Sequence, residues 1–117
     1  MPQTYVALDL ETTGLDAEHD AIIEVGAAKF RQDKLLDTFS TFVDPGRHIP
    51  HDITVLTGIT DRDVSGGPQL YDVLPSLTSF VGELPVVGHS VDFDLRFLQQ
   101  HSPEFENAYL DTFELAG

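Results

Sequence analysis

Two acidic residues lie within a short apolar segment near the start of the sequence. Asp9 and Glu11 are separated by one residue in YVALDLETTGLD, residues 5–16. The alternation of apolar residues predicts a strand over residues 5–11, on which residues two apart share a face at a spacing of roughly 7 Å. Such carboxylates repel each other and favour the binding of a proton or of a hard divalent cation such as Mg²⁺ or Mn²⁺. An acidic strand face in contact with solvent is the alternative.

A third acidic residue lies where a predicted buried strand leads into a predicted helix, in VVGHSVDFDLRFL, residues 86–98. Asp94 is close to one helical turn from Phe97, so we expect it to lean toward the packed side of the helix. There it would complete a metal site with the first two acids. A favourable interaction with the helix N-terminus is the alternative, and it accounts well for Asp92.

The other predicted elements follow in a regular order. Strands are predicted at 22–30 and 35–43, helices at 52–56, 60–64, 69–81 and 91–100, and short strands at 84–88 and 109–111. The four-residue link between the second and third strands predicts a hairpin. Pro75 is expected to delay or kink its helix. Three meandering strands followed by helix-separated strands predict a mixed sheet flanked by helices, with the later strands parallel to the first.

Length and composition indicate one cytoplasmic domain spanning residues 1–117. The chain has 117 residues, 41% of them hydrophobic, and no cysteine, which excludes disulfides and thiolate metal sites. No apolar run approaches the ~20 residues that cross a membrane, so we expect no membrane partner. The net charge is −14, and such a surface repels nucleic acid unless bound cations change the local sign.

An ordered set of motifs resembles the DEDD 3′-5′ exonucleases, in the DEDDh branch typified by the proofreading epsilon subunit of bacterial DNA polymerase III. The motifs are DLETTGL, IIEVGAAKF, LTGIT, GHSVDFDLRFL and LDTFELA, and they run in order along nearly the whole chain. The resemblance implies a ribonuclease-H-like α/β fold. In that fold a mixed five-stranded sheet has three antiparallel strands followed by parallel strands, with helices on both faces.

The resemblance also implies a chemistry and a set of site residues. Two divalent cations, Mg²⁺ or Mn²⁺, would support phosphodiester hydrolysis at the 3′ end of a nucleic acid, with a nucleoside monophosphate as product. The implied catalytic residues and metal ligands are Asp9, Glu11 and Asp94. Backbone amides around Thr12, Thr13 and Gly14 would meet the terminal nucleotide, and Leu56, Thr57 and Phe93 would line its base and sugar. A capped turn and core packing are the alternatives for these positions.

Two departures from the family pattern stand out. Ser90 replaces a common asparagine and is expected to cap the following helix. The third motif, a histidine and then Asp five residues later, is expected on a helix after Asp111 and is absent. His101 and Glu106 have the same separation, but Ser-Pro interrupts the helix between them, so we interpret that spacing as coincidence. We therefore expect a C-terminally incomplete exonuclease domain that cleaves poorly by itself.

Two other function classes stay open. One is a non-catalytic ribonuclease-H-like binding module attached to a polymerase or helicase, and the other is a structural acidic domain. The presence of all three acids favours the nuclease. We expect a DNA substrate and a proofreading or repair role, although these residues leave DNA and RNA undistinguished.

Overall fold

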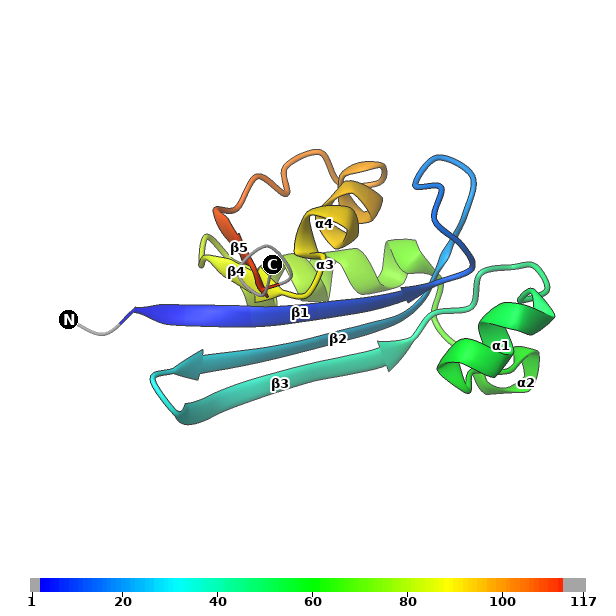
Figure 1. Ribbon diagram of the computed structural model, residues 1–117, viewed down its shortest axis with the longest axis horizontal. Helices are drawn as coiled ribbons and strands as arrows, with labels where there is room; N and C mark the ends of the chain where they lie inside the picture. Colours follow the sequence, from blue (N-terminus) through cyan, green and yellow to red (C-terminus); the bar gives the residue numbers. More distant parts are fainter. Residues whose placement is uncertain (1–2, 113–117) are drawn as a thin grey trace.

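The computed structural model describes residues 3–112, which form one α/β unit around a five-stranded sheet (Figure 1). The strands are β1 (Thr4–Thr12), β2 (Ile22–Arg31), β3 (Lys34–Phe42), β4 (Val86–Gly88) and β5 (Tyr109–Asp111). Their order is β3-β2-β1-β4-β5. The first three strands are antiparallel, whereas β4 is parallel to β1 and β5 is parallel to β4. The predicted mixed sheet is thereby confirmed.

The helices are α1 (His51–Thr57), α2 (Asp61–Val64), α3 (Leu70–Val81) and α4 (Val91–Gln99). Gly58 ends α1 in the left-handed conformation, and a capping box between Thr60 and Asp63 begins α2, as their residue types indicate. Contrary to expectation, Pro75 does not delay α3. It lies inside the helix, which begins at Leu70, and its ring is on the exposed side. No helix within residues 3–112 has the length and apolar character needed to cross a membrane.

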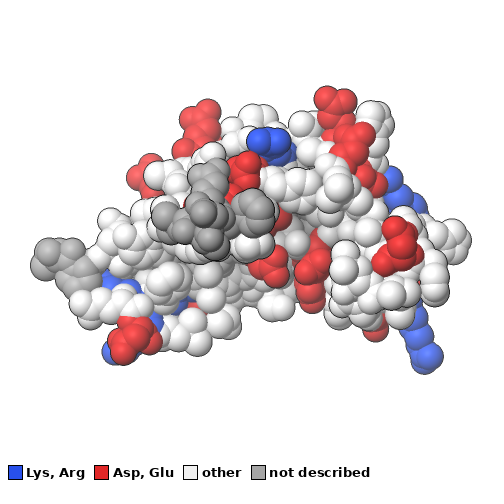
Figure 2. All heavy atoms as spheres, viewed as in Figure 1, with Lys and Arg blue, Asp and Glu red and all other residues white. Residues whose placement is uncertain are grey.

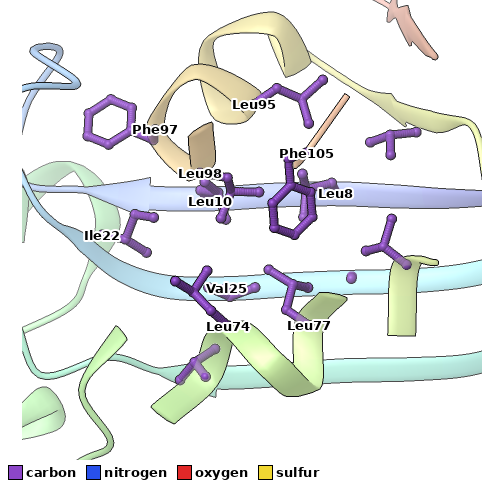
Figure 3. Close-up of a cluster of buried hydrophobic side chains, with 14 of the residues drawn as sticks. Leu8, Leu10, Ile22, Val25, Leu74, Leu77, Leu95, Phe97, Leu98 and Phe105 are labelled. Carbon is purple, nitrogen blue, oxygen red and sulfur yellow. The ribbon is translucent and has the colours of Figure 1, made fainter. Parts of the chain in front are cut away.

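Both longer helices pack on the same face of the sheet. The core contains Val6, Leu8 and Leu10 of β1, together with residues of α3 and α4 such as Leu77 and Leu98 (Figure 3). The opposite face carries a shallow hollow of about 590 Å³, lined by strand residues and His89. No helix residue within 3–112 lines that hollow, so helices over the second face stay a prediction.

A β-bulge connects the sheet to the α1–α2 pair. Glu11 lies opposite Glu24 and Thr12 lies opposite Ile22, so Ile23 is an extra residue in β2. Ile22 joins the main core, whereas Ile23 packs with a second cluster of Ile49, Ile53, Ile59 and Val64. The bulge thus anchors α1 and α2 beyond the end of β1 (Figure 1).

Candidate active site

A pocket of about 530 Å³ lies at the C-terminal end of β1. β1, the loop after it, α1 and the start of α4 all contribute to its walls. The lining includes the three predicted acids, Asp9, Glu11 and Asp94, and all the predicted nucleotide residues except Thr13, namely Thr12, Gly14, Leu56, Thr57 and Phe93. The fold therefore brings Asp9 and Asp94, which are 85 positions apart in the chain, to one site.

Asp94 is the most buried of the three acids, with 4% of its surface exposed. Its Oδ2 accepts a hydrogen bond from the backbone N–H of Leu10 at 3.4 Å. The pKa of Asp94 is raised to about 7, chiefly by burial and also by the charges of Asp9, Glu11 and Asp111, while the hydrogen bond from Leu10 lowers it. The side chain is thus an acid that is partly protonated near neutral pH in the absence of a cation.

The two strand acids differ in their surroundings. Asp9 is exposed, whereas Glu11 is half-buried and lies directly opposite Glu24 in the antiparallel ladder. Burial, followed by the charges of Asp9 and Glu24, raises the pKa of Glu11. Glu24 was not predicted as a site residue, because its proximity depends on the strand register.

The donor set fits a hard divalent cation. Three carboxylates from β1 and α4 line the same pocket, and mutual repulsion among them is one cause of the raised pKa values. As the side chains stand, however, no group of three or more His, Asp or Glu in residues 3–112 is arranged to hold a metal ion. Asp94 instead engages Leu10. The structure therefore brings the predicted ligands to one pocket without assembling a coordination sphere.

The structure does not bring Thr13 to the pocket. Only 4% of its surface is exposed, and its backbone N–H donates to the carbonyl oxygen of Ala21 at 2.8 Å. Its hydroxyl group donates to Oδ1 of Asp20 at 3.0 Å and accepts from the N–H of Ala21 at 2.9 Å. The alternative interpretation of a bonded turn therefore describes Thr13. Asp20 was missed by the sequence analysis, because nothing in its spacing signals this contact.

Ser90 does not cap α4 as expected. Its backbone is left-handed, with φ 57°, and its side chain makes no capping hydrogen bond. The carboxylate of Asp111 instead accepts a hydrogen bond from the N–H of Ser90 at 2.8 Å. Asp111 is 4% exposed and lies at the end of β5, which pairs with β4. The turn into α4 is therefore held from the neighbouring strand.

Exposed apolar side chains form the rim of the pocket. Leu15 is 86% exposed and Leu56 is 80% exposed, although both line the pocket. Phe93 is half-buried, and its ring lies 4.9 Å from the ring of the buried Phe97. Exposed apolar groups gathered around a pocket are typical of a surface that binds a ligand or a partner. Leu15 was not predicted as a site residue.

The charge around the pocket is mainly negative. Acidic side chains are scattered over the face shown in Figure 2, as expected for a net charge of −14. A phosphate-containing ligand would be repelled by this surface at long range. Cations bound by the acids of the pocket would change the sign of the charge locally.

The family comparison matches residues 6–116 to a family model described as Exonuclease. A DNA polymerase III of PolC type from Clostridium perfringens is 42% identical over 116 residues. That match covers 96% of this chain and 8% of the relative. The epsilon subunit of DNA polymerase III from Aquifex aeolicus is 39% identical over 118 residues, which cover 97% of this chain and 58% of the relative. The chain thus spans less than two thirds of these relatives.

Solved structures show the same fold. Exonuclease X in complex with 5′ overhanging duplex DNA is 28% identical, with a TM-score of 0.77. The match covers 96% of this chain and 61% of that chain. The zinc-bound complex of E. coli exonuclease I with single-stranded DNA gives a TM-score of 0.81 at 16% identity, and covers 97% of this chain and 29% of that chain. At that identity the likeness concerns the fold alone.

Proposed function

Because this chain belongs to the exonuclease family, we propose that it provides a 3′-5′ exonuclease activity on DNA and releases nucleoside monophosphates. One observation carries the proposal. Three acids from β1 and α4 share a single pocket with the residues expected to hold the terminal nucleotide. A binding module without chemistry needs the nucleotide pocket but not the three acids.

We assign the two cations, Mg²⁺ or Mn²⁺, to Asp9, Glu11 and Asp94. When bound, such a pair supplies an activated water and stabilises the charge on the phosphate and on the leaving 3′ oxygen. For its part, Asp94 must give up the proton that burial favours before its carboxylate can hold a cation. Burial therefore couples metal binding to proton release at this residue.

The nucleotide would lie between the two walls of the pocket. Leu56 on α1 and Phe93 on α4 offer apolar surface to the base and the sugar, and Thr12 and Gly14 offer backbone groups. The hydroxyl group of Thr12 donates a hydrogen bond to the carbonyl oxygen of Gly14 at 2.7 Å, and this bond closes the turn between the two residues. Apolar walls of this kind position the terminal nucleotide and exclude water from it.

We propose a polymerase as the partner. The most similar relatives named above are DNA polymerase III proteins, in which the matched region is a part of a longer chain. A polymerase would also bring the DNA to an acidic surface that repels it. A proofreading role follows from that placement.

We place the general base and the fourth acid of the proposed site outside residues 1–117. In the given sequence Asp111 is followed by TFELAG, which contains no histidine. A positioned general base contributes roughly 10²- to 10⁴-fold to rate. We therefore propose that residues 1–117 alone cleave DNA poorly.

The test uses a labelled single strand with Mn²⁺ and follows release of the 3′ nucleotide. It compares residues 1–117, a longer chain that continues them with the third motif, and the longer chain carrying Glu11→Gln. We expect cleavage only by the longer unmutated chain. A matched control, Glu18→Gln, removes an exposed acid from the loop after β1 and should leave cleavage unchanged.

Two results would contradict this proposal in different ways. Robust cleavage by residues 1–117 would mean that the base is misassigned. An inactive longer chain that still binds metal and single-stranded DNA would favour the non-catalytic binding module.

A further inference from the structure

The loop between β1 and β2 is closed by a carboxylate that the proposed chemistry does not use. Asp20 is half-buried, and its Oδ1 accepts the hydroxyl group of Thr13 at 3.0 Å. Its Oδ2 accepts the backbone N–H of Asp16 at 2.9 Å, and its own N–H donates to the carbonyl oxygen of Asp16 at 2.7 Å. One side chain therefore bonds to both ends of the segment 13–16.

The same carboxylate lies against Gly14. A Cβ atom added to Gly14 would meet the Asp20 carboxylate, with Cγ at 2.7 Å and Oδ1 at 2.8 Å. Real Cβ atoms do not make contacts that short, so the residue at this position must be glycine while Asp20 keeps its place. The Asp20 carboxylate thus packs directly against Gly14, which lines the pocket.

The hydrogen bonds of this loop continue to Ala21, the residue before β2. The backbone N–H of Thr13 donates to the Ala21 carbonyl oxygen at 2.8 Å, and the Ala21 N–H donates to the Thr13 hydroxyl oxygen at 2.9 Å. Thr13 is buried and makes these bonds. Its neighbours Thr12 and Gly14 line the pocket instead. The orientation of the turn therefore depends on the contacts beneath it.

We infer that Asp20 is a positioning residue, which holds the turn of residues 12–15 in the shape that receives the terminal nucleotide. This inference rests on the proposed function, because it assigns the turn to nucleotide binding. Asp20 is not a member of the acid set, since Asp9, Glu11 and Asp94 line the pocket and Asp20 does not. Loss of its carboxylate leaves the Thr13 hydroxyl and the Asp16 N–H without their acceptor and lets the turn move.

The inference predicts a separation between nucleotide binding and metal binding. Asp20→Ala should weaken binding of a nucleotide about tenfold, the effect of losing one to two net hydrogen bonds. Affinity for Mn²⁺ should stay unchanged, because Asp9 and Glu11 are held by the ladder between β1 and β2 and Asp94 by α4. A loss of general stability alone would not produce this separation.

The experiment titrates the 117-residue chain with Mn²⁺, and then with thymidine monophosphate at saturating Mn²⁺, by calorimetry. Asp20→Ala is compared with Asp20→Asn, in which the amide oxygen can still accept the Asp16 N–H and the NH₂ group can donate to the Thr13 oxygen. Asn should therefore restore most of the affinity. The matched control is Asp33→Ala, which removes an exposed carboxylate from the β2–β3 turn.

A second variant keeps the test decisive if Asp20→Ala does not fold. Thr13→Val removes the hydroxyl group but keeps the side-chain shape, and it should weaken thymidine monophosphate binding without changing Mn²⁺ affinity. If a folded Asp20→Ala chain binds thymidine monophosphate as tightly as the wild type, the inference is overturned and the proposed function stands. If Asp20→Ala does not fold, the same result in folded Thr13→Val overturns the inference. A wild-type chain that binds Mn²⁺ but no thymidine monophosphate counts against the proposed nucleotide pocket and overturns the inference with it.

Discussion

Asp94 on α4 accepts a hydrogen bond from the backbone N–H of Leu10, the residue of β1 that separates Asp9 from Glu11. The bond places the helix acid beside the two strand acids. Leu10 itself points its side chain into the core and is 6% exposed. The geometry of the acid set is therefore tied to the packing of α4 on the sheet.

The first prediction concerns pH. The pKa of Asp94 is raised to about 7 by burial, whereas an aspartate in an unfolded chain titrates near ~3.9. The folded state holds the Asp94 proton more tightly than the unfolded state does. The contribution of this proton to the free energy of unfolding is therefore complete below the unfolded pKa and is lost as the pH rises toward 7. The slope is at most about 1.4 kcal/mol per pH unit. Urea unfolding in EDTA between pH 4.5 and 7.5 measures it.

Asp94→Asn should remove this part of the pH dependence. Asp92→Asn is the control, because it removes a carboxylate from the same helical turn, where it pairs with Arg96 at 3.3 Å. The raised pKa of Glu11 adds a slope of the same sign in both variants. Parallel curves for wild-type and Asp94→Asn would show that Asp94 is not the group that titrates.

The second prediction concerns metal. At ten times its dissociation constant, a cation that binds only the folded chain stabilises it by about 1.4 kcal/mol. For a chain of this length that raises Tm by roughly 4–6 °C. We expect this rise with Mn²⁺ at pH 7.5, and a much smaller rise in Asp9→Asn and Asp94→Asn.

Asp37→Asn serves as the control for metal binding, since Asp37 is exposed on the edge strand β3 and does not line the pocket. Thermal unfolding monitored by circular dichroism gives the shift. An equal rise in wild-type and Asp9→Asn would remove Asp9 from the ligand set.

The third prediction separates packing from binding. Phe97 is 1% exposed and belongs to the core, so Phe97→Ala should lower the free energy of unfolding by about 3–5 kcal/mol. Leu56 is 80% exposed, so Leu56→Ala should change it by less than about 0.5 kcal/mol. Leu56→Ala should nevertheless weaken oligonucleotide binding in fluorescence anisotropy. Unchanged binding would show that Leu56 does not contact the substrate.

The fourth prediction concerns the turn before α4. Ser90 has φ 57° and its side chain makes no capping bond, so Ser90→Gly should stabilise the chain by up to about 1 kcal/mol. Ser90→Ala should be nearly neutral. Asp111→Ala should destabilise by about 1–3 kcal/mol, because it leaves the Ser90 N–H without its acceptor. If urea unfolding shows that Ser90→Ala lowers the free energy of unfolding by about 1 kcal/mol, the Ser90 hydroxyl group does cap α4.

Local order along the chain was predictable because its causes are local. The alternation of Val6, Leu8 and Leu10 predicts a strand with one buried face, and the structure has that strand and that face. Gly58 and Thr60 mark helix ends by conformational preference and capping, which act within a few residues. The acids at positions 9 and 11 share a face by the period of a strand alone.

What lies next to these residues was decided by tertiary structure. Thr13 and Asp20 bond across a loop of seven positions, Asp111 holds Ser90 from a neighbouring strand, and Glu24 reaches Glu11 through the strand register. None of these contacts has a periodic signature, because each depends on loop closure or on strand pairing. The left-handed backbone of Ser90 likewise follows from the turn between β4 and α4, and not from a preference of serine.

The sequence by itself determined the order of the elements and the shared strand face of Asp9 and Glu11, since residue type and short-range period act before the chain is packed. Only the tertiary structure decided that α3 and α4 share one face, that Asp94 is buried against the Leu10 N–H, and that its pKa lies near 7. Burial and electrostatic coupling depend on distances between residues remote in the chain. Those distances exist only once the sheet and helices have packed.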